Sequence, residues 1–301
     1  MLLYVMESKG SSPGRQGFMM AVNANGEMIG SLGGGIMEHK FVELAKTKLQ
    51  QAAPESSVHH QWHDKQAAKN QSGMICSGEQ TIFLYTVQEH DVHSIDSLVQ
   101  SLARNKNGTL QLTPEGISFL DEVPHNDFQV AFTARNKFLY REKTGYKNHL
   151  YIIGGGHCAL ALSQLMSSMD FYIHLLDDRA GLNTMEQNQF VHEKTCIDDY
   201  AALKSIIPNG ENIYVVIMTV GYRTDAISLK SLLGKDLGYL GILGSSTKIA
   251  KMFTDLEEET VSKNAINQVY APIGIPIKSQ TPEEIAVSIA AEIISVKNKD
   301  L

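Results

Sequence analysis

The sequence has few cysteines and no long apolar run. Its three cysteines, Cys76, Cys158 and Cys196, lie far apart, and no Cys-x-x-C spacing occurs. This low, odd count argues against a disulfide framework and a cysteine zinc site, and it favours a reducing compartment. No run approaches the ~18 apolar residues of a membrane span, and the amino terminus lacks the basic stretch of a secretory signal. We therefore expect a cytoplasmic protein without a membrane partner.

Positive charge is also scarce. Lys and Arg number 26 against 33 Asp and Glu, which gives a formal net charge of −7. This balance disfavours nucleic acid as a partner, although it leaves room for a local basic pocket. The sequence contains no His-Glu-x-x-His, nucleophile-elbow or protein-kinase pattern, so no common catalytic motif identifies it as an enzyme.

Length and pattern predict two domains. A chain of 301 residues that is 43% hydrophobic and 20% charged is typical of globular proteins. Residues 1–145 predict a mixed α/β domain, because Asn25-Gly26 is a hairpin signal and residues 36–49 have helical spacing. The polar segment 54–73 predicts a loop, and the charged segment 141–148 predicts a linker.

Residues 146–301 follow another pattern, in which short apolar runs alternate with longer amphipathic ones. The run 213–219 is apolar on both faces, as a buried parallel strand should be. This alternation predicts a Rossmann-like, doubly wound parallel sheet. Near the end, Thr281-Pro282-Glu283-Glu284 has the residues of a capping box that opens a helix.

The strongest local motif is Gly154-Gly155-Gly156-His157-Cys158-Ala159, which follows an apolar strand. In this G-x-G-x-x-A pattern, Gly154 permits a tight turn, Gly156 lets the backbone approach a pyrophosphate, and Ala159 allows close helix–sheet packing. Asp177 lies 21 residues after Gly156, at the end of the next strand, where a ribose acceptor is expected. His157 is a candidate donor to the same ligand. The alternative is a tight strand–helix turn without a ligand.

Two further segments have weaker signals for anion binding. Asp178 and Arg179 follow Asp177, and Arg179 is a candidate for binding a phosphate or carboxylate. The alternatives are a helix N-cap and a surface ion pair, with Asp178 as a possible partner of Arg179. Gly244 and Ser245 lie in a small-residue turn before a helix, and an ordinary helix cap is the alternative to an anion site there.

Thiol and imidazole groups are candidates for soft-metal chemistry. Cys76 lies among small residues just before a strand, and it is either a buried inert thiol or a thiolate for molybdenum or sulfur chemistry. His59, His60 and His63 lie in a polar segment, where we expect a solvated loop rather than a metal site.

Several segments together resemble the XdhC/CoxI family, the accessory factors of xanthine dehydrogenase and related molybdenum hydroxylases. The resemblance extends from Gly10 to Ile294 in the family's order. Two positions depart from the family pattern, since Ser77 replaces a glycine and Val220 a histidine. The matching segments are Gly10–Gly17, Gly30–Glu38, Met74–Gly78, Gly154–Ala159, Asp177–Arg179, Tyr239–Ser245, Ala271–Ile275 and Thr281–Ile293.

The resemblance implies a protein that binds the molybdenum cofactor, as molybdopterin or its cytosine dinucleotide. It further implies that a cysteine desulfurase supplies sulfur, that an apo molybdenum hydroxylase of the xanthine dehydrogenase type receives the cofactor, and that the chain forms a homodimer. In this interpretation Cys76 binds the metal. The residues expected to contact the cofactor are Gly33, Gly34, Gly35, Glu38, Gly154, Gly156, His157, Asp177, Asp178, Arg179, Gly244 and Ser245.

Two other classes of function stay open. An NAD(P)-dependent oxidoreductase would use the same glycine-rich loop, bind a nicotinamide cofactor and turn over a substrate. A nucleotide-sensing module would bind a ligand without any effect on hydroxylase maturation. Among the three classes, we favour the non-catalytic cofactor chaperone over an oxidoreductase.

Overall fold

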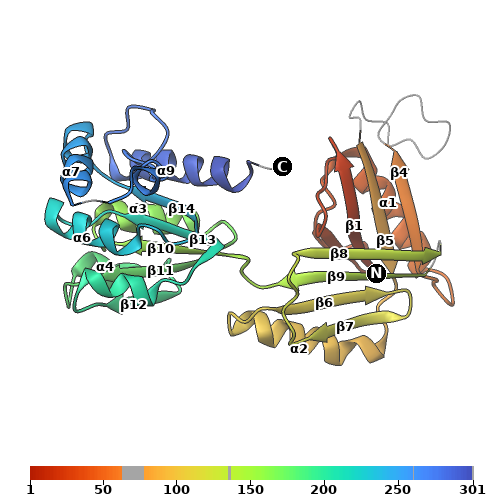
Figure 1. Cartoon of the computed structure of the whole chain (residues 1–301). Helices are drawn as coiled ribbons and strands as arrows, with labels where there is room; N and C mark the ends of the chain where they lie inside the picture. The colour runs from red at the N-terminus through yellow and green to blue at the C-terminus, as the bar shows by residue number, and fades with distance from the viewer. Residues whose placement is uncertain (63–77, 135–136, 260, 300–301) are drawn as a thin grey trace. The chain divides into compact units, whose positions relative to one another are not determined.

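The computed structural model describes residues 1–62, 78–134, 137–259 and 261–299. The chain divides into two compact units, Met1–Gly145 and Tyr146–Leu301 (Figure 1). The α/β class expected from the sequence is confirmed. Both sheets of the first unit are antiparallel, and the sheet of the second unit is parallel.

The first unit has two sheets, ordered β3-β2-β1-β5-β4 and β7-β6-β9-β8. Its described strands are β1 (Leu2–Gly10), β2 (Met19–Val22), β3 (Met28–Gly30), β4 (Ser57–Trp62), β5 (Gly78–Tyr85), β6 (Gly108–Thr113), β7 (Gly116–Leu120), β8 (Phe128–Ala134) and β9 (Lys137–Thr144). Its described α-helices are α1 (Gly35–Leu49) and α2 (Val92–Ala103).

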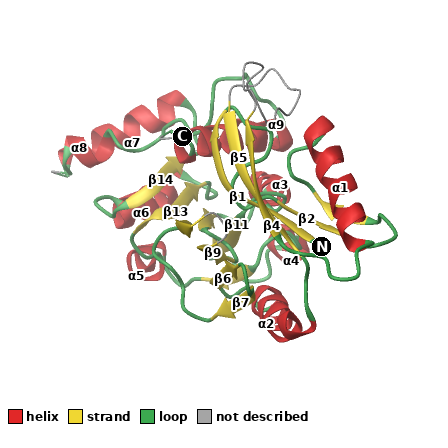
Figure 2. Cartoon of the chain, turned by 90° about the vertical axis from the view of Figure 1, so that its right-hand side faces the viewer, coloured by secondary structure: helices red, strands yellow, loops and turns green. Residues whose placement is uncertain are grey.

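Side-chain alternation along β1 explains how these layers pack. Successive residues of a strand point to opposite faces. Leu3 and Val5 therefore join the core that contains Phe41 of α1, whereas Tyr4 joins the core that contains Tyr140 of the second sheet. Helix α2 packs on that second core and lies beside β6 and β7 (Figure 2).

The structure confirms the hairpin at Asn25-Gly26 and the helix that follows the glycine run. The prediction of a loop over 54–73 is wrong for residues 57–62, which form β4 because they pair along β5. The predicted linker at 141–148 is also wrong for most of its length, since β9 runs to Thr144 and the next strand begins at Asn148. The charged side chains of this segment are half-buried and find polar partners: Arg141, for example, donates from Nε to Gln111 Oε1 on β6 at 2.9 Å.

The second unit is a five-stranded parallel sheet with helices on both faces. Its strands are β10 (Asn148–Ile153), β11 (Phe171–Asp177), β12 (Glu193–Cys196), β13 (Gly210–Ile217) and β14 (Leu237–Ile242), in the order β12-β11-β10-β13-β14. Its described α-helices are α3 (His157–Met166), α4 (Asn183–Gln187), α5 (Leu203–Ile206), α6 (Tyr222–Leu232), α7 (Ser246–Glu258), α8 (Lys263–Ile266) and α9 (Pro282–Lys297).

Two apolar cores cover the two faces of this sheet. Leu150 and Ile152 of β10 pack with residues of α3 and α9, whereas Ile153 packs with residues of α5, α6 and α7. This is the doubly wound arrangement that the sequence predicts (Figure 1). The predicted capping box is present at the start of α9, where the Glu284 N–H donates to Thr281 Oγ1 at 3.2 Å.

The strand order positions the candidate site. The chain moves outward from β10 to β11 and β12, and then returns to the other side of β10 with β13. In open parallel sheets, ligands bind beyond the carboxyl ends of the strands at such a reversal. Within the described ranges, no helix is long and apolar enough to cross a membrane.

Candidate functional site

Two loops meet where the strand order reverses, and we call them the switch-point loops: residues 154–157 after β10 and residues 218–221 after β13. A Cβ atom on Gly154 would lie 2.4 Å from the Met218 carbonyl oxygen, and the φ angle of Gly154 is +108°. Only glycine suits both conditions, since side chains rarely adopt this φ and the approach leaves no room for a methyl group. Gly154 therefore lets the two loops lie in contact.

The neighbouring glycine is held by the end of β11. The Gly155 N–H donates to Asp177 Oδ2 at 2.7 Å, and the Gly155 carbonyl accepts the Thr184 hydroxyl at 2.5 Å. The Gly154 N–H donates to the Leu176 carbonyl at 2.7 Å. These bonds hold the first half of the loop against β11 and α4.

The second half of the loop is open. No side chain caps the amino end of α3 at Gly156, and a Cβ on Gly156 would have nothing within 4 Å among the described residues. His157, the first residue of α3, is exposed, whereas Ala159 is fully buried against the sheet. The first N–H groups of a helix have no partner inside it and carry a partial positive charge. This end of α3 can therefore receive an anion, as the glycine pattern predicts.

Asp177 is placed differently from a ribose acceptor. Its carboxylate is fully buried and accepts four hydrogen bonds: the Gly155 N–H, the Arg179 N–H at 2.9 Å, and two from the Arg179 guanidinium, Nε at 2.8 Å and Nη2 at 2.7 Å. A carboxylate has about four acceptor positions. A ribose hydroxyl would have to displace one of these donors.

The charge of Asp177 is stabilised by the same contacts. Burial alone would raise the pKa of its carboxyl group, but the hydrogen bonds from Arg179 and Gly155 outweigh burial and lower that pKa below its ordinary value. The suggested pairing of Arg179 with Asp178 is wrong, because the guanidinium binds Asp177. Asp178 is exposed and accepts the Tyr200 hydroxyl at 2.9 Å instead.

Gly244 and Ser245 lie between β14 and α7, where Ser245 is the N-cap of α7. Its hydroxyl accepts the Lys248 N–H at 3.3 Å. The ordinary cap that the sequence allowed is therefore present, and the Ser245 side chain stays exposed. Anion binding at this turn remains a prediction.

One buried ion pair beside the switch-point loops was missed by the sequence analysis. Asp225 of α6 is fully buried, accepts the Thr219 N–H at 3.0 Å and hydroxyl at 2.6 Å, and pairs with the Lys248 ammonium of α7. The pair fixes the loop after β13 on two helices. Asp225 and Lys248 are 23 residues apart, and only the adjacency of β13 and β14 brings them together, so no local motif could have indicated them.

The glycine run of the first unit forms its own tight turn. Gly33, Gly34 and Gly35 have φ angles of +111°, +79° and +73°. The Glu38 carboxylate folds back over this turn and accepts the Ser31 hydroxyl at 2.7 Å and the N–H groups of Leu32 and Gly34 at 2.8 and 3.0 Å. Glu38 thus stabilises the turn through these three hydrogen bonds. These four candidate residues belong to the first unit, and the other described candidates to the second.

The candidate metal ligands have separate outcomes. Cys76 and His63 lie outside the described residues. His59 and His60 are neighbours on β4, so they point to opposite faces; His59 contacts Ser57 Oγ at 2.9 Å and His60 contacts Thr81 Oγ1 at 3.1 Å. The expectation of a loop there is wrong. Within the described ranges, no group of three or more His, Cys, Asp or Glu side chains could hold a metal ion.

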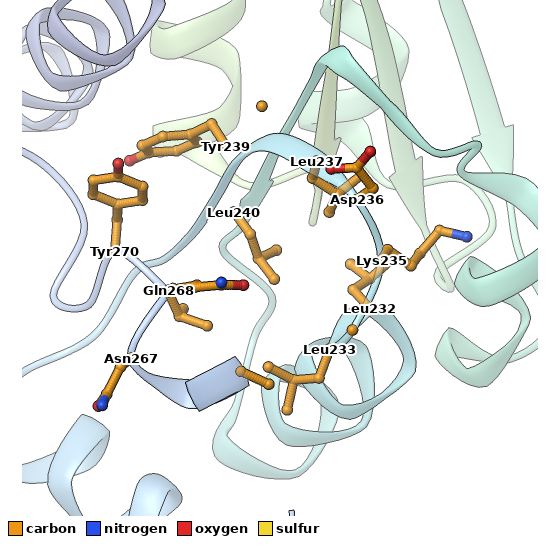
Figure 3. A pocket seen from close by; sticks show the side chains of 14 residues that line it. Leu232, Leu233, Lys235, Asp236, Leu237, Tyr239, Leu240, Asn267, Gln268 and Tyr270 are labelled. Atoms are coloured by element: carbon orange, nitrogen blue, oxygen red, sulfur yellow. The ribbon is translucent and has the colours of Figure 1, made fainter. Parts of the chain in front are cut away.

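A cavity of about 450 Å³ lies beside the start of β14, away from the carboxyl ends of the strands (Figure 3). Leucine side chains such as Leu232 and Leu240 line it together with the amide of Gln268. None of the candidate cofactor or metal residues from the sequence lines it, and two of its polar residues, Asn267 and Gln268, are exposed. The switch-point loops therefore remain the better candidate site.

Comparison with known proteins identifies relatives of both units. Residues 1–60 match the family model described as the XdhC and CoxI family, and residues 150–293 match the model described as the XdhC Rossmann domain. The uncharacterized protein YqeB of Escherichia coli K12 is 25% identical over 299 residues, which are 98% of this chain and 43% of that protein.

A second relative, described as a probable subunit of xanthine dehydrogenase from Bacillus subtilis 168, is 32% identical over 84 residues, which are 28% of this chain and 23% of that protein. The chain thus spans less than half the length of these two relatives. A crystal structure described as a xanthine dehydrogenase from Bacillus halodurans shares the fold, with a TM-score of 0.73 and 22% identity over 100% of this chain and 92% of that one. Since the two family models match both units, the chain belongs to the XdhC and CoxI family.

Proposed function

We propose that this chain is an accessory protein that binds the molybdenum cofactor, supports its sulfuration and delivers it to a molybdenum hydroxylase of the xanthine dehydrogenase type. Family membership supports the proposal, and two relatives described as xanthine dehydrogenase proteins support the class of partner. The observation that carries the binding step is the uncapped amino end of α3 beside Gly156, where free N–H groups can bind a phosphate.

The residues of the second unit fit a ligand that ends in a phosphate. Gly156 leaves space for close approach, α3 presents N–H groups, and the Arg179 guanidinium lies beside the same loop through Asp177. The cofactor is cargo in this proposal, and it supplies its molybdenum chemistry in the hydroxylase that receives it. The residues of this chain bind the phosphate end and orient the cargo.

The first unit has a separate part in the proposal. Cys76 binds the metal or its sulfur, a cysteine desulfurase supplies that sulfur, and two copies of the chain form a homodimer. Three donors already engage the carboxylate of Glu38. We therefore assign Glu38 the role of holding the turn at Gly33–Gly35, rather than that of a direct cofactor ligand.

The test is anaerobic equilibrium binding of the molybdenum cofactor to the full chain, with NAD and NADP titrated in parallel. The variants are Gly156→Val, which fills the open space at α3, and Cys76→Ala, with the exposed Cys196→Ala as the matched thiol control. We expect saturable cofactor binding that Gly156→Val weakens at least tenfold and that Cys196→Ala leaves unchanged. A second assay measures activation of an apo hydroxylase of the xanthine dehydrogenase type.

The NAD(P)-dependent oxidoreductase is the main competitor, because it would use the same glycine-rich loop. Tight nicotinamide binding without uptake of the molybdenum cofactor would refute the proposal and favour that competitor. Cofactor binding without any activation of the apo hydroxylase would reduce the role to binding alone. If Cys76→Ala binds as the wild type does, the thiol is not the metal ligand.

A further inference from the structure

The buried carboxylate of Asp177 is saturated by groups of the chain itself. Its two oxygens accept the N–H groups of Gly155 and Arg179 and two guanidinium N–H groups of Arg179, at 2.7 to 2.9 Å. A carboxylate that holds a ribose presents free acceptor positions to both hydroxyls of the diol. Asp177 has none to present, so a diol is a poor match for this end of the loop.

The same contacts orient Arg179. An arginine guanidinium has five N–H donors in a planar fork. Asp177 takes one from Nε and one from Nη2, and the other three donate to no acceptor among the described residues. The Arg179 side chain is 39% exposed. Its outer edge, with Nη1 and the second hydrogen of Nη2, is thus held in one orientation and remains available for an end-on contact.

Arg179 also lies beside the first half of the glycine-rich loop, next to the residue that precedes Gly156. The Gly155 nitrogen and Arg179 Nη2 are each 2.7 Å from the same Asp177 oxygen. A fixed guanidinium beside free backbone N–H groups favours a dianionic phosphate through bidentate, charge-assisted hydrogen bonds.

We propose that Asp177 is a positioning residue that holds Arg179 beside the glycine-rich loop, and that Arg179 selects a terminal phosphate monoester over a ribose diol. The inference rests on the proposed function, because it names the ligand group bound at the same loops. It favours a pterin that ends in a phosphate over a dinucleotide whose ribose would contact Asp177.

The test compares two ligands that differ by one phosphate, 6-hydroxymethylpterin phosphate and 6-hydroxymethylpterin, with NADH as a ribose probe. Each is titrated into the full chain by fluorescence or calorimetry. The variants are Arg179→Gln, Arg179→Lys and Asp177→Asn. Lys251→Gln, an exposed residue of α7, removes the same charge elsewhere as a control. The readout is the ratio of the two pterin affinities, which a general loss of stability would not change.

We expect the wild type and Lys251→Gln to bind the phosphorylated pterin at least tenfold more tightly than the unphosphorylated one. Arg179→Gln and Asp177→Asn should lower this ratio at least threefold, while the N–H groups of α3 should keep it above one. Arg179→Lys should keep part of it, because its charge remains while the fork is lost. If Asp177→Asn does not fold, the two Arg179 variants still decide the question.

Four results would overturn the inference. In the wild type, these are equal affinity for the two pterins and no binding of either. In the variants, they are a ratio that Arg179→Gln leaves unchanged, and NADH binding that Asp177→Asn abolishes while Arg179→Gln does not. Failure of the proposed function looks different. The expected ratio would then be seen, while the chain would neither bind the molybdenum cofactor nor activate the apo hydroxylase.

Discussion

Alanine at Gly154 and alanine at Gly156 should have different effects, although both residues belong to one loop. Gly154 has a φ of +108°, and its new Cβ would lie 2.4 Å from the Met218 carbonyl oxygen. The unusual backbone conformation costs about 1–3 kcal/mol in a residue with a side chain. Moving the Met218 backbone aside costs about as much again, by analogy with overpacked cores. We expect Gly154→Ala to lose about 2–6 kcal/mol of unfolding free energy.

Gly156→Ala should cost little. Gly156 has a φ of −75° and a ψ of −171°, which any residue adopts, and its new Cβ meets nothing within 4 Å among the described residues. The gain from a less flexible unfolded chain, about 0.4–1 kcal/mol, is offset by the poorer N-cap that alanine makes. The net change should lie within about 1 kcal/mol of zero. Ligand binding should still weaken, because the methyl group enters the space beside the amino end of α3.

The assay is calorimetric unfolding of the full chain, with hydrogen exchange of β10 and β13 peptides to locate the change in the second unit. At about 2–4 °C per kcal/mol for a unit of this size, Gly154→Ala should lower the unfolding midpoint by roughly 10 °C. Gly156→Ala should shift it by no more than about 4 °C. Equal stability of the two variants would refute the close contact between the switch-point loops.

Three further predictions concern stability. Glu292→Ala should lower the free energy of unfolding by about 1–3 kcal/mol, because the buried Tyr239 hydroxyl loses its acceptor at 2.5 Å. Glu292→Gln keeps an acceptor, so urea unfolding should show a smaller loss. Equal losses for the two variants would contradict this role of Glu292. Burial lowers the pKa of His174 to about 4, whereas the unfolded residue has a pKa of ~6.5. Between these pH values the unfolded chain binds the proton more tightly. The contribution of neutral His174 to stability should therefore be full above about pH 6.5 and decline as the pH falls to about 4. His174→Gln should flatten that part of a profile of urea midpoint against pH, and an unchanged slope would point to other groups. Thr281→Ala should lower the free energy of unfolding by about 1 kcal/mol, because it removes the N-cap of α9. Thr281→Ser should keep the thermal midpoint of the wild type. Equal midpoints for the two variants would show that the cap contributes nothing.

Much of the fold could be predicted because its signals are local. Asn25-Gly26 demands a tight hairpin, the Thr281–Glu284 box starts α9, and the apolar run of β13 requires burial on both faces. The errors arose where pairing partners decide the structure. Residues 57–62 lie in a mainly polar segment, and they became β4 because β5 provides hydrogen bonds along one side. Residues 141–143 are charged, and they extend β9 between β6 and β8.

The candidate site divides in the same way. The sequence by itself determined the glycine turn, the start of α3 and the acid at the end of β11, because spacing along the chain sets these features. Only the tertiary structure decided what Asp177 does. Its burial beside Gly155 and the return of Arg179 onto it fill every acceptor position. Hydrogen-bond saturation depends on which groups surround a residue in space, and a one-dimensional pattern does not contain that information.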